Sequence, residues 1–137
     1  MNALDATRKW VRSSPVIDSD NKFNVNYLGA TATTYTLDTA GESHRQDVCG
    51  NDIMTCNLVF AARLPYGSTL TQNVSANDLF QDLRNWIMQQ ERQHSYPTQV
   101  EGYAATRVTT ANAGIVLEAG ASTARYQLQI QIVFEEL

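Results

Sequence analysis

The sequence predicts an α+β fold: one compact domain, residues 1–137, with a mainly antiparallel sheet packed by one long and one short helix. Three observations predict it. The chain has 137 residues, a length that suits one domain rather than two. Segments that alternate apolar and polar residues lie on both sides of a single long segment with the helical period. Hydrophobic residues make up 43% of the chain, which is enough for a core and argues against disorder.

Residues 1–23 predict a short helix over 2–12, followed by a polar turn at 18–22. Trp10 is the largest apolar side chain of this helix. Pro15 ends it, because proline disfavours the helical backbone conformation at the residue before it.

The remaining residues, 24–137, predict the sheet and the long helix. Residues 39–52 hold Gly41, Gly50 and several acids without any apolar period, so they predict an exposed loop. The stretch 114–118 either extends the strand before it or re-enters the sheet. Strands rich in β-forming residues are predicted at 24–28, 33–37, 56–63, 104–110 and 124–135.

The clearest element is an amphipathic helix over about 77–94, laid on the sheet. Ser75 and Asp78 predict its start as a variant capping box: a hydroxyl accepts a backbone N–H and an acid occupies the first turn. Pro97 follows its end. One face of the helix collects the residues that we expect to be packed: Leu79, Phe80, Leu83, Trp86, Ile87 and Gln90.

The last strand alternates strictly, so one of its faces packs on helices and the other meets solvent or a partner. The inward-facing set is Tyr126, Leu128, Ile130, Ile132 and Phe134. The outward-facing set is Arg125, Gln127, Gln129, Gln131 and Glu135.

Charge and composition exclude several classes of protein. The formal net charge is -4 and no basic cluster stands out, so sequence-led nucleic-acid binding is not expected. No run approaches the length of a transmembrane helix, and Asp5 lies where a signal peptide needs basic residues. We therefore expect a protein made in a cytosol, with no membrane partner and with reduced cysteines. Thr, Asn and Gln supply about a quarter of the chain, a composition that suits packing against other protein surfaces.

Metal sites are not predicted. Six residues separate Cys49 from Cys56. Paired cysteines of zinc sites are usually separated by only two to four residues. The run that starts at Asp18 resembles a calcium loop, but Phe23 and Gly29 occupy the positions that need Gly and Glu. We expect Cys56 to be a buried structural cysteine.

Catalysis is not predicted either. His44 and His94 lie in no recognisable nucleophile or base motif, and no phosphate-binding or dinucleotide fingerprint occurs. The sequence thus predicts neither an enzyme nor a cofactor site.

Gln127, Gln129 and Gln131 form a ladder of amides along the last strand. Such a ladder is either an ordinary solvated sheet face or a surface that meets neighbouring subunits. Amides suit the second role, because they form hydrogen bonds without the desolvation cost of a charge.

Several short motifs follow one another in an order that resembles the small tail terminator, or tail completion, proteins of long-tailed bacteriophages. These proteins are also described as minor capsid or minor tail proteins. The resemblance runs from about residue 24 to the end, and its most specific part is Ala-Arg-Tyr-Gln-Leu-Gln at 124–129. The motifs are Asn-Val-Asn-Tyr-Leu-Gly (24–29), Tyr-Thr-Leu (35–37), Leu-Val-Phe-Ala-Ala-Arg (58–63), Tyr-Gly (66–67), Gln-Asn (72–73), Leu-Phe-Gln-Asp-Leu (79–83), Trp-Ile (86–87), Tyr-Pro (96–97) and Thr-Ala-Arg-Tyr-Gln-Leu-Gln-Ile (123–130).

This resemblance implies a structural virion protein that catalyses nothing. Six copies would form a ring on the last ring of the tail tube, stop tube growth and provide the joint to the head connector. The implied partners are further copies of the chain, the tail tube protein and a head connector or head-completion protein, with genomic DNA passing through the channel. The implied location is the head–tail junction of the virion, after assembly in the cytoplasm of the host.

The resemblance also implies roles for individual residues. Arg63, Asn73 and Arg125 match polar family positions, which are either local structural contacts or contacts to another subunit or the tube; the amide ladder joins them as candidates. The loop near 41–55 departs from the family pattern, which leaves its partner contacts open. The residues expected in the core are Phe60, Leu79, Phe80, Leu83, Trp86, Tyr126, Leu128 and Ile130.

Two alternatives remain at the level of sequence. A head-completion protein or a tail tube subunit is the neighbouring one, and a tube subunit would polymerise on its own. A small cytosolic α+β enzyme or ligand-binding module is an alternative of a different class, which a deep pocket with convergent polar groups would favour.

Overall fold

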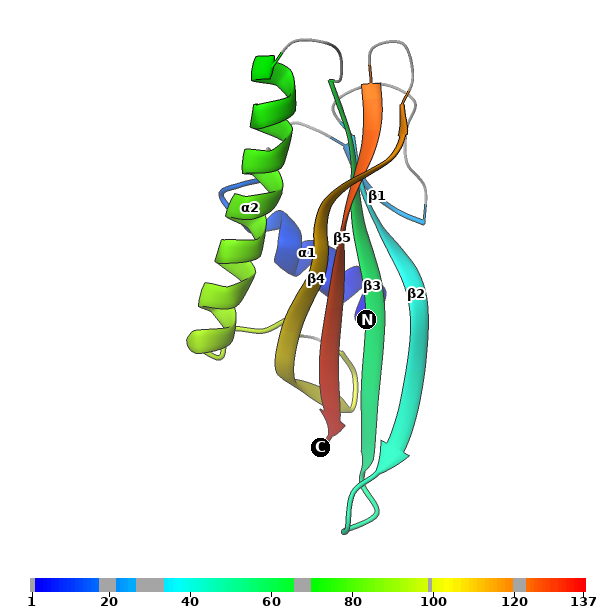
Figure 1. The fold of residues 1–137 in the computed structure, drawn as a ribbon. Coiled ribbons are helices and arrows are strands. Elements are labelled where there is room, and N and C mark those ends of the chain that lie inside the picture. Colours follow the sequence, from blue (N-terminus) through cyan, green and yellow to red (C-terminus); the bar gives the residue numbers. More distant parts are fainter. Residues whose placement is uncertain (1, 18–21, 27–33, 66–69, 99, 120–122) are drawn as a thin grey trace.

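A computed structural model describes residues 2–17, 22–26, 34–65, 70–98, 100–119 and 123–137. They form two helices and five strands in one α+β domain, as predicted (Figure 1). In chain order the elements are α1 (Ala3–Arg12), β1 (Lys22–Val25), β2 (Thr34–Gln46), β3 (Asp52–Pro65), α2 (Leu70–Arg92), β4 (Tyr103–Ala119) and β5 (Thr123–Glu136).

The five strands form one sheet in the order β1-β2-β3-β5-β4. The short strand β1 runs parallel to β2, and the other neighbours are antiparallel, which confirms a mainly antiparallel sheet. The last strand, β5, lies inside the sheet and pairs with β3 on one side and β4 on the other. Because β5 has a strand on each side, its inward face from Tyr126 to Phe134 is held against the core.

Both helices cover the same face of the sheet (Figure 1). Helix α2 lies against β4, and α1 lies near β1 and β2. The two helices meet where the rings of Trp10 and Trp86 lie 5.0 Å apart. The fold is therefore a two-layer arrangement in which both helices cover one sheet face, called here the inner face. The described residues place no helix on the opposite face, called here the outer sheet face.

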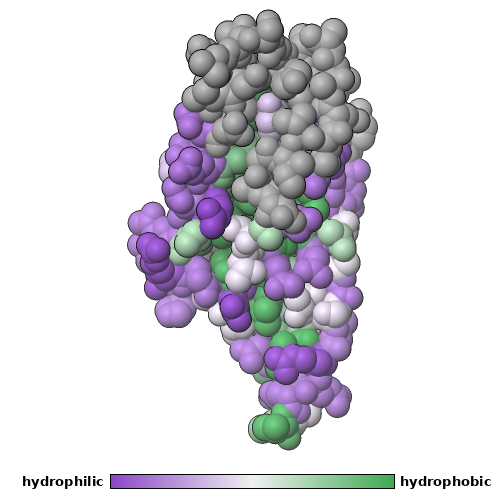
Figure 2. All heavy atoms as spheres, in the orientation of Figure 1, coloured by the Kyte–Doolittle hydropathy of each residue, from purple (hydrophilic) through white to green (hydrophobic). Residues whose placement is uncertain are grey.

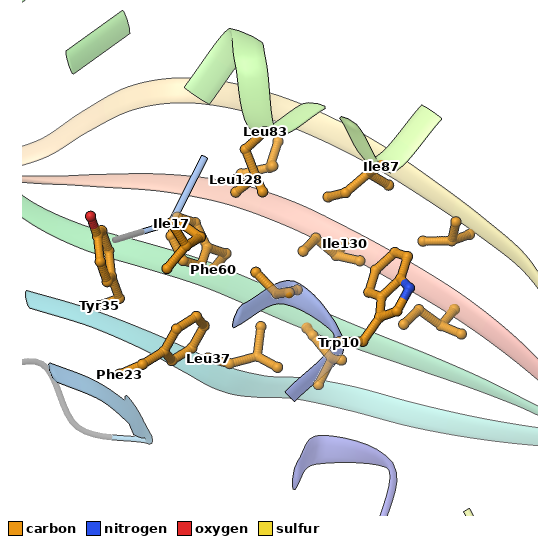
Figure 3. Packing of buried hydrophobic residues seen from close by; sticks show 14 of the residues in the cluster. Trp10, Ile17, Phe23, Tyr35, Leu37, Phe60, Leu83, Ile87, Leu128 and Ile130 are labelled. Carbon is orange, nitrogen blue, oxygen red and sulfur yellow. The ribbon is translucent and has the colours of Figure 1, made fainter. Parts of the chain in front are cut away.

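The core fills the space between the helices and the inner face (Figure 3). Phe60 of β3 lies at its centre, and its ring centroid is 5.7 Å from those of Phe23, Tyr35 and Phe80. Leu79 and Trp86 are partly buried at the rim of the core. The other expected core residues are at most 2% exposed, as predicted: Phe60, Phe80, Leu83, Tyr126, Leu128 and Ile130.

Helix α1 confirms the short helix predicted at the N-terminus. Its N-cap is Asn2, whose side-chain oxygen accepts a hydrogen bond from the backbone N–H of Asp5 at 2.8 Å. This bond satisfies one of the free N–H groups of the first turn. The Thr7 hydroxyl donates to the carbonyl of Ala3 at 2.7 Å, which satisfies a buried polar group inside the helix.

The predicted loop over 39–52 is wrong. Strand β2 continues to Gln46, and β3 begins at Asp52, so most of the segment is a hairpin arm. Backbone pairing with β3 holds the arm, although its side chains are exposed and show no apolar period. The register shifts between Thr39 and Gly41, where a β-bulge breaks the alternation.

A tight turn at 47–51 joins the two arms of this hairpin. The Asp47 carboxylate accepts hydrogen bonds from the backbone N–H groups of Cys49 at 2.8 Å and Asn51 at 3.0 Å. Gly50 has a φ of 84°, a left-handed conformation that glycine adopts without steric cost. Turn chemistry of this kind was visible in the sequence, but it belongs to a hairpin rather than to a loop.

The predicted start of the long helix is also wrong. Helix α2 begins at Leu70, so Ser75 and Asp78 lie inside it and form no cap. Each residue added to an existing helix gains a backbone hydrogen bond, so a helix can begin before the apolar period of its sequence does.

Strand β4 confirms the extension of the fourth predicted strand. It runs without interruption from Tyr103 to Ala119. The gap left between 110 and 114 corresponds to a register shift between Ala111 and Ile115, so it is an irregularity within one strand and not a break. At the start of the sheet, β1 covers Lys22–Val25, while 27–28 and Thr33 lie outside the described residues.

Candidate assembly surfaces

The outer sheet face carries the amide ladder. The alternation of β5 is confirmed, because its inward-facing set is at most 2% exposed. Gln129, Gln131 and Glu135 are exposed on the opposite side, and Arg125 and Gln127 are half-buried there. The ladder therefore lies on the face that no helix covers.

Neighbouring strands add neutral side chains to this face. The side-chain amide of Gln131 donates to the amide oxygen of Asn57 on β3 at 3.0 Å. Across β4, Thr109 lies opposite Gln131 and Ala111 lies opposite Gln129. A shallow hollow of about 350 Å³ lies over this region, lined by Asn57, Val59, Thr109, Ala111, Gln129 and Gln131. Such a surface can hydrogen-bond to a second protein without desolvating a charge.

Arg125 is engaged within the molecule. Its guanidinium lies 3.1 Å from the carboxylate of Asp38 on β2, and both side chains are only about a quarter exposed. Asp38 also accepts a hydrogen bond from the Thr36 hydroxyl at 2.8 Å. The ion pair crosses β3 and connects β5 to β2. The sequence left two roles open for Arg125, and this ion pair corresponds to the first of them, a local structural contact.

The structure separates the other two polar candidates. Arg63 is half-buried on β3, directly opposite Arg125 on β5 and Thr34 on β2, so it lies on the outer sheet face beside the ladder. Asn73 lies in the first turns of α2, in the helical layer on the opposite face, and its side chain is outside the described residues. The candidates therefore do not form one cluster: Arg63, Arg125 and the amides share a face, and Asn73 does not.

A second polar cluster, which the sequence did not predict, lies at the base of the β2–β3 hairpin. The His44 ring nitrogens lie 2.8 Å from the carboxylate of Asp52 and 3.1 Å from that of Glu42. The Tyr103 hydroxyl of β4 donates to Asp52 at 2.7 Å. These contacts connect the hairpin to the far edge of the sheet. A signal was present, because alternate residues of a strand share a face and place Glu42 beside His44.

The pKa values in this cluster shift in complementary directions. Hydrogen bonds to Asp52 and Glu42 raise the pKa of His44. Hydrogen bonds from Tyr103 and His44 lower the pKa of Asp52. The hydrogen bond to Asp52 raises the pKa of Tyr103 to about 12. The folded state therefore favours protonated His44, ionised Asp52 and neutral Tyr103.

We expect this cluster to make stability depend on pH. Because the pKa of His44 is raised, its contribution is fully present below the unfolded value near 6.5 and is lost as the pH rises through the folded pKa. The contribution of Asp52, whose pKa is lowered, is present above its unfolded value near 3.8 and is lost as the pH falls. The free energies of unfolding of wild type and His44→Gln, measured in urea, should therefore differ most between about pH 3.8 and pH 6.5.

His94→Asn is the matched control, because His94 lies beyond α2 and contacts Tyr96 rather than these carboxylates. Its stability should run parallel to that of wild type from mildly acidic to alkaline pH. If the stability of His44→Gln also followed that of wild type across this pH range, the predicted contribution of the cluster to stability would be contradicted.

The two cysteines are unpaired and differ in environment. Cys56 is buried, as expected, and burial raises the pKa of its thiol to about 12. Cys49 is exposed in the hairpin turn. Within the described parts of the chain, no group of three or more His, Cys, Asp and Glu side chains is placed to hold a metal ion.

A groove between α2 and the edge strand β4 is a third surface, also missed from the sequence. Its volume is about 340 Å³, and Arg84, Met88 and Arg92 of α2 and Arg107 of β4 line it. The signal was the four-residue spacing of Arg84, Met88 and Arg92, which places them on one helix stripe. We call this feature the arginine groove.

Glu91 links the two walls of the arginine groove. Its carboxylate accepts a hydrogen bond from the backbone N–H of Val108 at 2.9 Å. An edge strand leaves such N–H groups without a strand partner, and a side chain from the covering helix here takes that place. Burial, followed by a hydrogen bond to the same carboxylate, raises the pKa of Tyr96.

No helix in the described part of the chain is long and apolar enough to cross a membrane. Comparison with known proteins finds no family model and no curated protein that matches the chain.

Proposed function

We propose that this protein is a structural subunit of a bacteriophage virion that forms a ring on the end of the tail tube. The ring, of six copies, ends tube growth and forms the joint to the head connector or head-completion protein. Genomic DNA passes through its centre. The protein acts at the head–tail junction and catalyses no reaction.

The outer sheet face carries this proposal. Its exposed part around Gln129 and Gln131 consists of amides, hydroxyls and small side chains, and Arg125 on the same face is neutralised by Asp38. A face of this kind suits contact with a neighbouring subunit or the tube, where unpaired charges would be costly.

Two different sheet edges support the ring. Strand β4 is one edge of the sheet, and the far half of β2, beyond its pairing with β1, is the other. A ring closed by rotation needs two unlike surfaces on each subunit that fit one another. The stretches that carry the resemblance to tail terminators include 58–63, 79–83, 86–87 and 123–130, which fall in β3, α2 and β5, between the two edges.

Deletion of the gene in its phage tests the function, with negative-stain microscopy of the lysate as the readout. We expect overlong, headless tails beside filled heads, because the tube then has no terminator. A wild-type copy supplied from a plasmid should restore tails of normal length. The same plasmid with an early stop codon is the control and should not.

Other results would reassign the protein. Tails of normal length beside heads that have lost DNA would move it to the head side of the joint. Purified protein that polymerises alone into long tubes would make it a tube subunit. Intact, infectious particles from the deletion phage would exclude the structural role altogether.

A further inference from the structure

The arginine groove carries unbalanced positive charge. Among the described residues, Arg84, Arg92 and Arg107 make no ion pair. The Glu91 carboxylate is committed to the backbone N–H of Val108 and to Tyr96. The groove also offers apolar surface, because Met88 is 40% exposed between the arginines. An occupant should therefore combine negative charge with an apolar side chain.

The tip of the β2–β3 hairpin has those properties. Val48 is 104% exposed, so the whole side chain is free of contacts with its own subunit. Figure 2 shows this tip as an apolar point at the end of a polar extension of the molecule. Asp47 supplies the negative charge of the turn itself, whereas Glu42 and Asp52 lie at its base and contact His44.

The hairpin cannot reach the groove of its own subunit. The hairpin joins β2 and β3, whereas the groove lies between α2 and β4, and β5 separates β4 from β3 in the sheet. In Figure 1 the hairpin lies at the lower end of the molecule, where it extends past the end of α2. Two unlike surfaces on opposite sides of one subunit are the arrangement that a heterologous contact needs.

We propose that the hairpin tip of one copy docks in the arginine groove of the next copy. Val48 packs beside Met88 of the neighbour, and Asp47, the acid next to Val48, faces Arg84, Arg92 and Arg107. This inference deepens the proposed function and rests on it for the claim that the repeated contact closes a ring. The pairing itself is a property of the isolated protein.

Disulfide trapping tests the contact, since it captures weak association as well as stable rings. Met88→Cys places a thiol in the groove, and the native Cys49 supplies one beside Val48 at the tip. Under mild oxidation we expect a ladder of covalent oligomers. Met88→Cys combined with Cys49→Ser should abolish the ladder, and the lack of any ladder in the first variant would overturn the proposal.

Charge reversal tests the chemistry of the contact. Arg84→Glu with Arg92→Glu reverses the groove, and Val48→Lys with Asn51→Lys reverses the tip at two exposed positions. Introduced into the trapping background, each pair should reduce the trapped fraction at least about tenfold, because like charges that face one another oppose association. Lys9→Glu with Arg12→Glu changes the charge as much on exposed positions of α1 and should leave the ladder intact.

The most specific test mixes the variant with the reversed groove and the variant with the reversed tip. The reversed tip of one fits the reversed groove of the other, and the two unchanged surfaces fit as in wild type, so the equimolar mixture should recover the ladder. Circular dichroism of each variant should match wild type. The proposal would be overturned if charge reversal left the amount of disulfide-linked oligomers unchanged. It would also be overturned if the mixture of the two variants formed no more oligomers than either variant alone. Either result leaves the deletion experiment, and the function it tests, unaffected.

Discussion

Phe60→Ala should lower the free energy of unfolding by about 3–5 kcal/mol, because it removes a large buried ring and leaves a cavity. Phe60 is 0% exposed and lies among the rings of Phe23, Tyr35 and Phe80. Those rings come from β1, β2 and α2, so the cavity would open between both layers of the fold. A small domain has a total stability of about 5–15 kcal/mol, and the change should be plain in urea unfolding followed by circular dichroism.

Val59→Ala is the control for this prediction. Val59 is the next residue of β3, half-buried on the outer sheet face, where the loss of two methyl groups opens no closed cavity. We expect Val59→Ala to lower the free energy of unfolding much less than Phe60→Ala does. Phe60→Leu keeps most of the side-chain volume, so its effect should lie between the two. Equal costs for Val59→Ala and Phe60→Ala would contradict the assignment of inner and outer faces.

Most of the sheet can be predicted from the sequence, because burial of one sheet face makes apolar and polar residues alternate along each strand. β5 is the clearest case: its residues from Tyr126 to Phe134 alternate between the core and the outer sheet face. A shift of one residue would expose every one of its core side chains, so the register is strongly specified. The amide ladder could be predicted for the same reason.

The hairpin arm of β2 could not be predicted, because neither of its faces is buried. Residues 39–46 are exposed on both sides, so no apolar period marks them as a strand. Their hydrogen bonds to β3, together with the turn at Asp47 and Gly50, hold the arm. Backbone pairing leaves little trace in side-chain composition, and the glycines then predict a loop.

The start of α2 was misplaced for a related reason. The apolar stripe that packs on the sheet begins at Leu79, and a prediction from periodicity begins the helix there. The residues from Leu70 onward extend the helix without that stripe. A hydroxyl and an acid near the start of the stripe then resemble a cap, although they lie inside the helix.

Of the candidate surfaces, only those within one element could be predicted. The ladder belongs to one strand, and its side of the sheet follows from alternation. The Arg125–Asp38 pair joins residues 87 positions apart, and the arginine groove joins α2 to β4. Contacts of this kind depend on strand order, and the order β1-β2-β3-β5-β4 is not encoded in any local pattern.

Trp10→Ala should cost about as much as Phe60→Ala, roughly 3–5 kcal/mol, although Trp10 lies in a helix of only ten residues. Isolated helices of that length are marginal in water, so α1 depends on its tertiary contacts. Trp10 supplies two of them: its ring lies 5.0 Å from that of Trp86, and its indole N–H donates to the carbonyl of Ser95 at 3.1 Å. The side chain is only 9% exposed.

Two further variants separate these contacts. Trp10→Phe keeps a ring but leaves the Ser95 carbonyl without its donor, and we expect it to cost about 1–2 kcal/mol in urea unfolding. A double-mutant cycle between Trp10 and Trp86 should give a coupling of about 0.5–1.5 kcal/mol, the range of tilted aromatic pairs. Lys9→Ala, at the exposed neighbouring position, should change little. If Trp10→Ala were as mild as Lys9→Ala, α1 would not be docked on α2. The cover over β1 and β2 would then have to be held in some other way, because the Trp10–Trp86 contact joins the two helices of the layer.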